Sequence, residues 1–179
     1  MQRGVSLIEL MVGMAILAIL LATAMPNFTT AIQNTQIRNT GEAILNGLSL
    51  ARAEAVMRNT QVNFILAAGN SWTVECTSAS TNCPGSSPAA SATTPSNIQA
   101  WNAGSSNAQV NPTAATITFN GMGKSTLSPG TTATFAISSN SGTCVLQGGL
   151  MRCLNVDVTS GGRVRMCDPA LATSDPQAC

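Results

Sequence analysis

The chain contains no histidine, only 8% charged residues and only 3% aromatic residues. The absence of histidine removes the commonest general base and metal ligand, and the few carboxylates are scattered along the sequence. Eight basic residues against seven acidic ones leave a formal net charge of +1, so no overall positive field is available to collect nucleic acid. We therefore expect no enzyme, no metal site and no cofactor, and any contact with a polyanion has to be local.

Six cysteines stand in this chain of 179 residues, and none of them belongs to a Cys-x-x-Cys pair. This pattern favours disulfides formed in an oxidising compartment over a zinc site. The six positions are Cys76, Cys83, Cys144, Cys153, Cys167 and Cys179. We interpret the protein as exported.

Residues 5–25 are almost wholly apolar apart from Ser6 and Glu9. A helix of this length is long enough to cross the hydrocarbon core of a membrane, and the segment continues into helix-forming sequence without the exit of a cleaved secretory signal. The sequence therefore predicts a transmembrane helix at residues 5–26. A carboxylate at the edge of such a helix is costly unless it meets a positive partner, so Glu9 requires one.

The residues around this carboxylate, Gly4-Val5-Ser6-Leu7-Ile8-Glu9-Leu10, resemble the class III signal of type IV prepilins and type II secretion pseudopilins. In that family a prepilin peptidase removes the leader, here residues 1–4, by cutting after Gly4, and methylates the new N-terminus, here Val5. The resemblance implies that Glu9 meets a terminal amine when subunits pack into a filament, which sets subunit register more than it adds stability. The family usually has Phe or Met where this chain has Val5. An uncleaved single-pass anchor is the alternative.

Apolar positions recur at three- and four-residue steps between residues 27 and 58, which predicts an amphipathic helix that continues the anchor. They are Ile37, Ile44, Leu48, Ala51 and Ala55. Pro26 stands where pilins often carry a proline that kinks or locally melts the helix. Strand-like runs at residues 62–66 and 72–76 offer this helix a surface to cover.

Residues 42–59 resemble the end of the helix in the GspH/FimT group of minor pilins. The resemblance implies the type IV pilin fold, an α+β fold in which a long N-terminal helix packs on an antiparallel β-sheet. The globular, periplasmic part is then residues 27–179. Within it, the Ser-, Thr- and Pro-rich residues 77–115 predict an extended surface loop, with a disordered linker as the alternative. We interpret Trp101 as an anchor onto the sheet; an exposed contact residue is the alternative.

The last third of the chain predicts a meander of antiparallel strands separated by Asn-Gly, Pro-Gly and Gly-Gly turn signals. The expected strands are residues 115–120, 131–138, 143–147, 150–159 and 163–167. If Gly148-Gly149 forms a two-residue hairpin loop, Cys144 falls opposite Cys153 in a non-hydrogen-bonded pair, whose short Cα distance suits a disulfide. For the other four cysteines, the short separations of Cys76 from Cys83 and of Cys167 from Cys179 favour disulfides between cysteines that are neighbours in the sequence. The expected pairs are Cys76–Cys83, Cys144–Cys153 and Cys167–Cys179.

Arg163 and Arg165 follow a Gly-Gly turn, and alternate residues of a strand point to the same face, so their guanidinium groups would form a clamp of phosphate size. The Gly-Arg-x-Arg pattern resembles the DNA-binding tail of FimT-type minor pilins, which capture extracellular DNA for natural transformation. The resemblance implies weak, nonspecific binding of double-stranded DNA. Lys124 and Arg152 are further candidates. The alternative is two solvated arginines that discourage pairing at a sheet edge.

Three functions agree with these features. The first is a FimT-like DNA-uptake pilin, the second a FimU-like structural minor pilin that primes pilus assembly, and the third the H-type minor pseudopilin of type II secretion. All three imply the same partners, which are other major and minor pilins, the prepilin peptidase and an inner-membrane assembly platform. They also imply a single-pass inner-membrane protein with a periplasmic C-terminal domain that later joins the filament, with the pilus tip as a candidate position.

Overall fold

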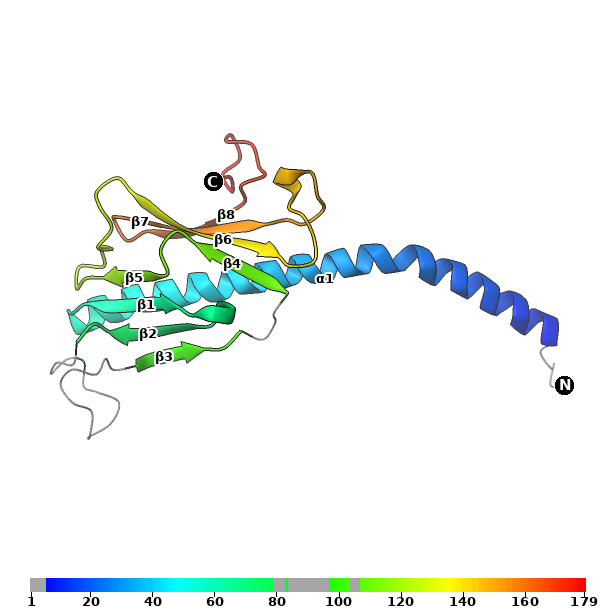
Figure 1. Ribbon diagram of the computed structural model, residues 1–179, viewed down its shortest axis with the longest axis horizontal. Coiled ribbons are helices and arrows are strands. Elements are labelled where there is room, and N and C mark those ends of the chain that lie inside the picture. Colours follow the sequence, from blue (N-terminus) through cyan, green and yellow to red (C-terminus); the bar gives the residue numbers. More distant parts are fainter. Residues whose placement is uncertain (1–5, 79–82, 84–96, 104–106) are drawn as a thin grey trace. The chain divides into compact units, whose positions relative to one another are not determined.

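The computed structural model describes residues 6–78, 83, 97–103 and 107–179 (Figure 1). The chain divides into two compact units, Met1–Ile32 and Gln33–Cys179. The helix α1 (Leu7–Arg58) contributes to both units. Gly4 and Val5, at the expected processing site, lie outside the described residues.

In the first unit, α1 carries a series of exposed large apolar side chains. They are Leu7, Ile8, Leu10, Met11, Val12, Met14, Ile16, Leu17, Ile19, Leu20, Leu21, Phe28 and Ile32. The helix is continuous from Leu7 to Arg58, so the local melting expected at Pro26 does not occur in α1. Among the described residues, no helix combines the length and the apolar character needed to cross a membrane.

In the second unit, the apolar face of α1 forms one side of the core. All five positions that the periodicity singled out are fully buried, which confirms the amphipathic helix; they are Ile37, Ile44, Leu48, Ala51 and Ala55. Burial of each Leu or Ile contributes about 1.5–3 kcal/mol, so this stripe accounts for much of the helix's attachment. Polar residues occupy the positions between, among them the exposed Arg38 and Arg52.

Within the described residues, the strands form two four-stranded antiparallel sheets. The first has the order β3-β2-β1-β5 and consists of β1 (Val62–Leu66), β2 (Trp72–Cys76), β3 (Asn97–Trp101) and β5 (Thr116–Phe119). The second has the order β4-β6-β7-β8 and consists of β4 (Ala108–Pro112), β6 (Thr132–Ser139), β7 (Leu154–Thr159) and β8 (Val164–Cys167). Two short 3-10 helices, η1 (Ala68–Asn70) and η2 (Val145–Gln147), complete the described elements.

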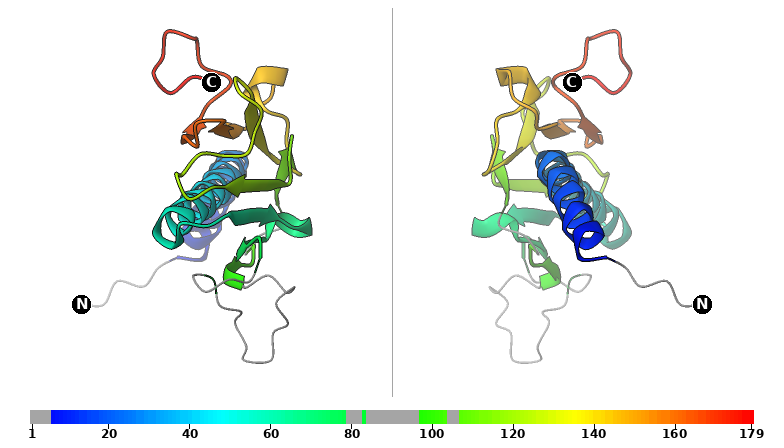
Figure 2. Two further views of the ribbon diagram at one scale, coloured as in Figure 1. Left: turned by 90° about the vertical axis from the view of Figure 1, so that its left-hand side faces the viewer. Right: turned by 90° about the vertical axis from the view of Figure 1, so that its right-hand side faces the viewer.

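Both sheets share one hydrophobic core with the second part of α1 (Figure 2). Phe64 of β1 meets Phe135 of β6 edge to face, with ring centroids 5.7 Å apart, and this contact joins the two sheets. Asn70 adds a polar connection, because its side chain donates to the carbonyl of Ala108 at 2.6 Å and accepts from the amide of Val110 at 3.1 Å. The pilin-like α+β arrangement expected from the sequence is therefore present, with two sheets where one was expected.

The expected surface loop at residues 77–115 is only partly correct, because it contains β3 and β4. Both are edge strands of their sheets. An edge strand pairs on one side only, and one with a half-solvated face carries few large apolar side chains. β3 (Asn97–Trp101) has this mixed burial, without a regular alternation of buried and exposed residues, and was not recognised as a strand from its sequence.

The expected hairpin at Gly148-Gly149 is wrong. Residues 145–147 form η2 instead of a strand, and Gly148 ends it in the left-handed region with φ 82° while its amide donates to the carbonyl of Val145. Cys144 is bridged to Met151 and not set opposite Cys153. A Gly-Gly pair can end a 3-10 helix as well as form a two-residue hairpin loop. The strand register that we predicted from a hairpin loop at this pair is therefore wrong.

The structure nevertheless joins Cys144 to Cys153, with Cα atoms 5.5 Å apart, and pairs the other cysteines in sequence as Cys76–Cys83 and Cys167–Cys179. We expect peptide mapping of the unreduced protein to give these three links and no others. The physical reason is proximity, since each pair is brought together by local chain geometry. A peptide linking Cys144 to any cysteine other than Cys153 would contradict the loop around η2.

Candidate functional site: a basic cluster at two turns

Glu9 lies in the first turn of α1 and is exposed. Its backbone amide donates to the Oγ of Ser6 at 3.3 Å, so Ser6 caps the helix. Ser6-Leu7-Ile8-Glu9 has the spacing of a capping box, in which an acidic residue near the helix start also complements the helix dipole. The bond uses the backbone amide of Glu9, whereas its carboxylate complements the helix dipole at the first turn, in addition to the filament role that the motif implies.

Arg163 and Arg165 have different surroundings in the structure. Arg163 precedes β8 in the β7–β8 turn, is exposed, and has no side-chain ion pair within the described residues. Arg165 lies in β8 opposite Asp157 of β7, and its Nη2 is 3.9 Å from the Oδ2 of that nearly buried carboxylate. The charge of Arg165 is thus partly compensated inside the fold, whereas that of Arg163 is available at the surface.

A close backbone contact brings a second cation to Arg163. Gly162 adopts φ 81°, and a side chain there would collide with the carbonyl oxygen of Gly123, in the turn after β5. The next residue in that turn, Lys124, is exposed, and its Cα lies 3.2 Å from the position of that missing side chain. Asn120 shapes the turn, because its Oδ1 accepts from the amide of Lys124 at 3.0 Å.

The helix supplies a third cation at the same place. The exposed Arg52 of α1 donates from its Nε to the carbonyl oxygen of Gly123 at 3.1 Å. Arg52, Lys124 and Arg163, which we call the basic cluster, therefore surround one contact between two turns. In the described part of the chain, none of the three makes an ion pair, whereas Arg38, Arg58, Arg152 and Arg165 each pair with a carboxylate.

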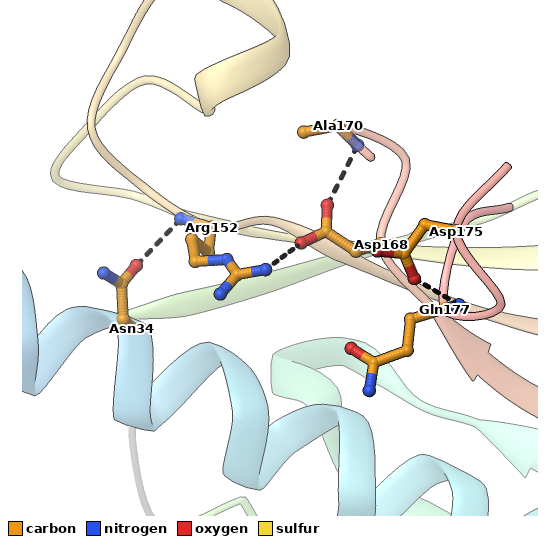
Figure 3. A network of polar contacts seen from close by, with 6 residues as sticks. All are labelled: Asn34, Arg152, Asp168, Ala170, Asp175 and Gln177. Atoms are coloured by element: carbon orange, nitrogen blue, oxygen red, sulfur yellow. Dashed lines mark hydrogen bonds and ion pairs between the residues drawn. The ribbon is translucent and has the colours of Figure 1, made fainter. Parts of the chain in front are cut away.

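Arg152 is not part of this cluster. Its Nη2 donates to the Oδ2 of Asp168 at 2.8 Å, and its backbone amide donates to the Oδ1 of Asn34 of α1 at 2.8 Å (Figure 3). Asp168 is 4% exposed, and its other carboxylate oxygen accepts from the backbone amide of Ala170 at 2.9 Å, so Arg152 supplies the opposite charge to a buried, hydrogen-bonded carboxylate. Arg152 thus links the C-terminal segment to the rest of the fold, and its charge is compensated by Asp168.

Sequence reasoning considered Lys124 but missed Arg52. No spacing rule connects a helix position with turns about 70 and 110 residues further along, because the contact depends on the tertiary approach of Gly123 to Gly162. One group of metal-ligand types, Asp157, Cys167 and Cys179, lies within 4.8 Å. Both sulfurs belong to a disulfide and are not thiolates, so this group does not suit a metal ion.

The fold defines the class of protein: a long N-terminal helix whose second part packs on antiparallel sheets is pilin-like. In agreement, the crystal structure of the type IV minor pilin FimU of Pseudomonas aeruginosa (strain PAO1) in space group P21 superposes with a TM-score of 0.55 at 18% sequence identity. The match covers 81% of this chain and 96% of the chain in that crystal structure. The same protein in space group P65 gives a TM-score of 0.49 at 20% identity, covering 79% and 98%. No curated protein matches the chain.

Residues 40–162 match the family described as type II transport protein GspH, and residues 1–25 match the prokaryotic N-terminal methylation motif. The chain belongs to the GspH family and is a minor pilin or pseudopilin. Members of the pilin family are structural proteins and not enzymes. Membership implies pilin partners in a filament and processing by a prepilin peptidase, and the methylation motif implies anchoring in the inner membrane before assembly.

Proposed function

We propose that this chain is a FimT-like minor pilin of a type IV pilus that binds double-stranded DNA nonspecifically for uptake in natural transformation. The observation that carries the proposal is the convergence of Arg52, Lys124 and Arg163, none of which has a carboxylate partner among the residues that the structure describes. On a chain of net charge +1, this is a local excess of positive charge supplied by three different elements. Phosphate contacts by such side chains need no particular base sequence.

The backbone that carries the cluster has a fixed geometry. Gly123 is held between the guanidinium of Arg52 and the backbone of Gly162, so the two turns and the helix cannot move apart without breaking these contacts. The guanidinium of Arg52 is therefore already ordered by its bond to Gly123, which lowers the entropy cost of its contact with a phosphate. Arg165 lies next to the cluster in sequence and adds its partly compensated charge.

We expect DNA binding by the full chain, in a zwitterionic detergent, to be weak and salt-dependent. Three phosphate contacts predict a loss of about 40-fold in affinity between about 50 and 200 mM salt. Arg163→Gln should reduce the slope of log affinity against log salt by about one, and a Lys124→Gln/Arg163→Gln double variant should abolish the shift of a duplex in a gel or anisotropy titration.

Arg38→Gln is the matched control, because it removes the same charge from an exposed arginine that pairs with Glu42. It should leave affinity and salt slope unchanged. Equal binding by the double variant and the unaltered chain, or no binding at low salt, would end the DNA-uptake proposal. A FimU-like pilin that primes assembly, or an H-type pseudopilin of type II secretion, would then replace it, and the neighbouring genes would separate those two.

A further inference from the structure

A groove of mixed polar and apolar lining lies between α1 and the edge strand β3, in the second unit. Its volume is about 550 Å³, and its lining includes Asn39, Glu42, Asn46, Trp72, Gln99 and Trp101. None of these residues belongs to the basic cluster. The proposed DNA binding therefore does not account for the residues that line this groove.

The groove exists because α1 covers β2 but not β3. Trp72 and Val74 of β2 face the helix and are 3% and 0% exposed. Their cross-strand partners on β3 are Trp101 and Gln99, which share the same face of the sheet. Gln99 is exposed and Trp101 is only partly buried, so the inner face of the edge strand is open beside the helix.

The two tryptophans form a fixed aromatic platform. Trp101 stacks on Trp72 with ring centroids 6.2 Å apart and an interplanar angle of 17°. Trp72 is in turn packed so closely under α1 that a side chain at Gly47 would approach its Cε2 to 2.8 Å. The orientation of Trp101 is therefore set before any ligand arrives, which lowers the entropy cost of binding to it.

Amide side chains surround this platform. Asn39 and Asn46 are exposed on one face of α1, and Gln99 faces them from β3. None of the three amides has a hydrogen-bond partner within the described residues, and each offers both donors and an acceptor. Glu42 stands between the two asparagines along the helix, with one carboxylate oxygen bound to the Nε of Arg38 at 2.9 Å.

We propose that this groove binds a neutral glycan. A sugar ring has an apolar C–H face that stacks on an aromatic plane, and a rim of hydroxyl groups that both donate and accept hydrogen bonds. Trp101 supplies the plane, and Asn39, Asn46 and Gln99 supply matching polar groups. The charged residue that lines the groove is Glu42, which disfavours a polyanion.

The chain itself provides the reporter for a test. Trp72 and Trp101 are its only tryptophans and it has no tyrosine, so its intrinsic fluorescence arises in the groove. We expect cellotetraose or chitotetraose, added to the full chain in a zwitterionic detergent without a sugar head group, to cause a saturable fluorescence change with a Kd of about 1 mM or below. Asn46→Ala/Gln99→Ala should weaken that binding about tenfold or more, because both side chains are exposed and their loss removes hydrogen bonds without a cavity.

Gln109→Ala/Asn111→Ala is the matched control, since it truncates one exposed glutamine and one exposed asparagine on β4. This control and Arg163→Gln should bind the tetrasaccharide as the unaltered chain does, so a failure here is distinct from a failure of DNA binding. Absence of a saturable change with either tetrasaccharide up to about 10 mM would overturn the proposal. Equal weakening by both double variants, or a response only to DNA or to an extended peptide that pairs with β3, would overturn it as well.

Discussion

Replacing Gly162 with alanine should destabilise the second unit by about 2 kcal/mol or more, because an L residue pays about 1–2 kcal/mol in the left-handed region and its Cβ would also collide with a backbone carbonyl. The φ of Gly162 is 81°, and the carbonyl belongs to Gly123, which cannot withdraw freely because Arg52 is bonded to it. In a chain of this size the change corresponds to a fall of about 4–8 °C in Tm, measured by circular dichroism.

Gly161→Ala is the control for this substitution. Its φ is not positive, and an added Cβ would meet nothing nearer than the Oγ1 of Thr159 at 3.8 Å. The two variants differ by one position and have the same composition, so equal Tm values would show that the turns do not meet as described. Because the same contact assembles the basic cluster, Gly162→Ala should also weaken DNA binding, whereas Gly161→Ala should not.

Glu9→Ala should reduce incorporation of this subunit into filaments by about 100-fold or more. If Glu9 meets the amine of Val5 in the assembled state, its removal leaves a buried ammonium without a partner, at a cost of about 3–5 kcal/mol. The measurement is the amount of the subunit in sheared filaments relative to the membrane, with mass spectrometry of the N-terminus to verify that cleavage after Gly4 and methylation still occur.

Glu9→Gln separates this filament role from the capping role of the same residue. Glutamine serves in a capping box as glutamate does, so the helix start should persist while the charge is lost. We expect Glu9→Gln to be as deficient in filaments as Glu9→Ala. Near-normal incorporation of the glutamine variant would show that the charge of Glu9 is not needed for assembly.

The sequence predicted the helix and the central strands because their burial has a simple period. The positions from Ile37 to Ala55 follow the helical repeat, and β1 and β2 have the same bounds as the expected runs. The secondary-structure prediction was wrong where a strand is covered on one face only, and where backbone hydrogen bonds rather than side-chain burial determine the local structure. β3 is a half-covered edge strand with polar side chains, and η2 replaced a strand because Gly148 closes a 3-10 turn.

The candidate site was predictable only in part for a related reason. Arg163 was identified from a local sequence motif, which can be recognised without knowledge of the tertiary structure. Whether a basic side chain is free depends on carboxylates that approach from elsewhere, as Asp168 does for Arg152 and Asp157 does for Arg165. Arg52 belongs to the basic cluster only because two glycine-containing turns meet in the folded protein, and no sequence pattern predicts that contact.

The three disulfides have a mechanical consequence. Their partners are separated by 7, 9 and 12 residues, so each closes a short local loop, and none connects one sheet to the other or either sheet to α1. Tension applied between the helix and the sheets is therefore carried by side-chain packing and by bonds such as that from Arg52 to Gly123, not by disulfides. When a subunit is pulled by its helix, the oxidised form should unfold and lengthen almost as much as the reduced form. The difference in length should equal only the three short loops that the disulfides close.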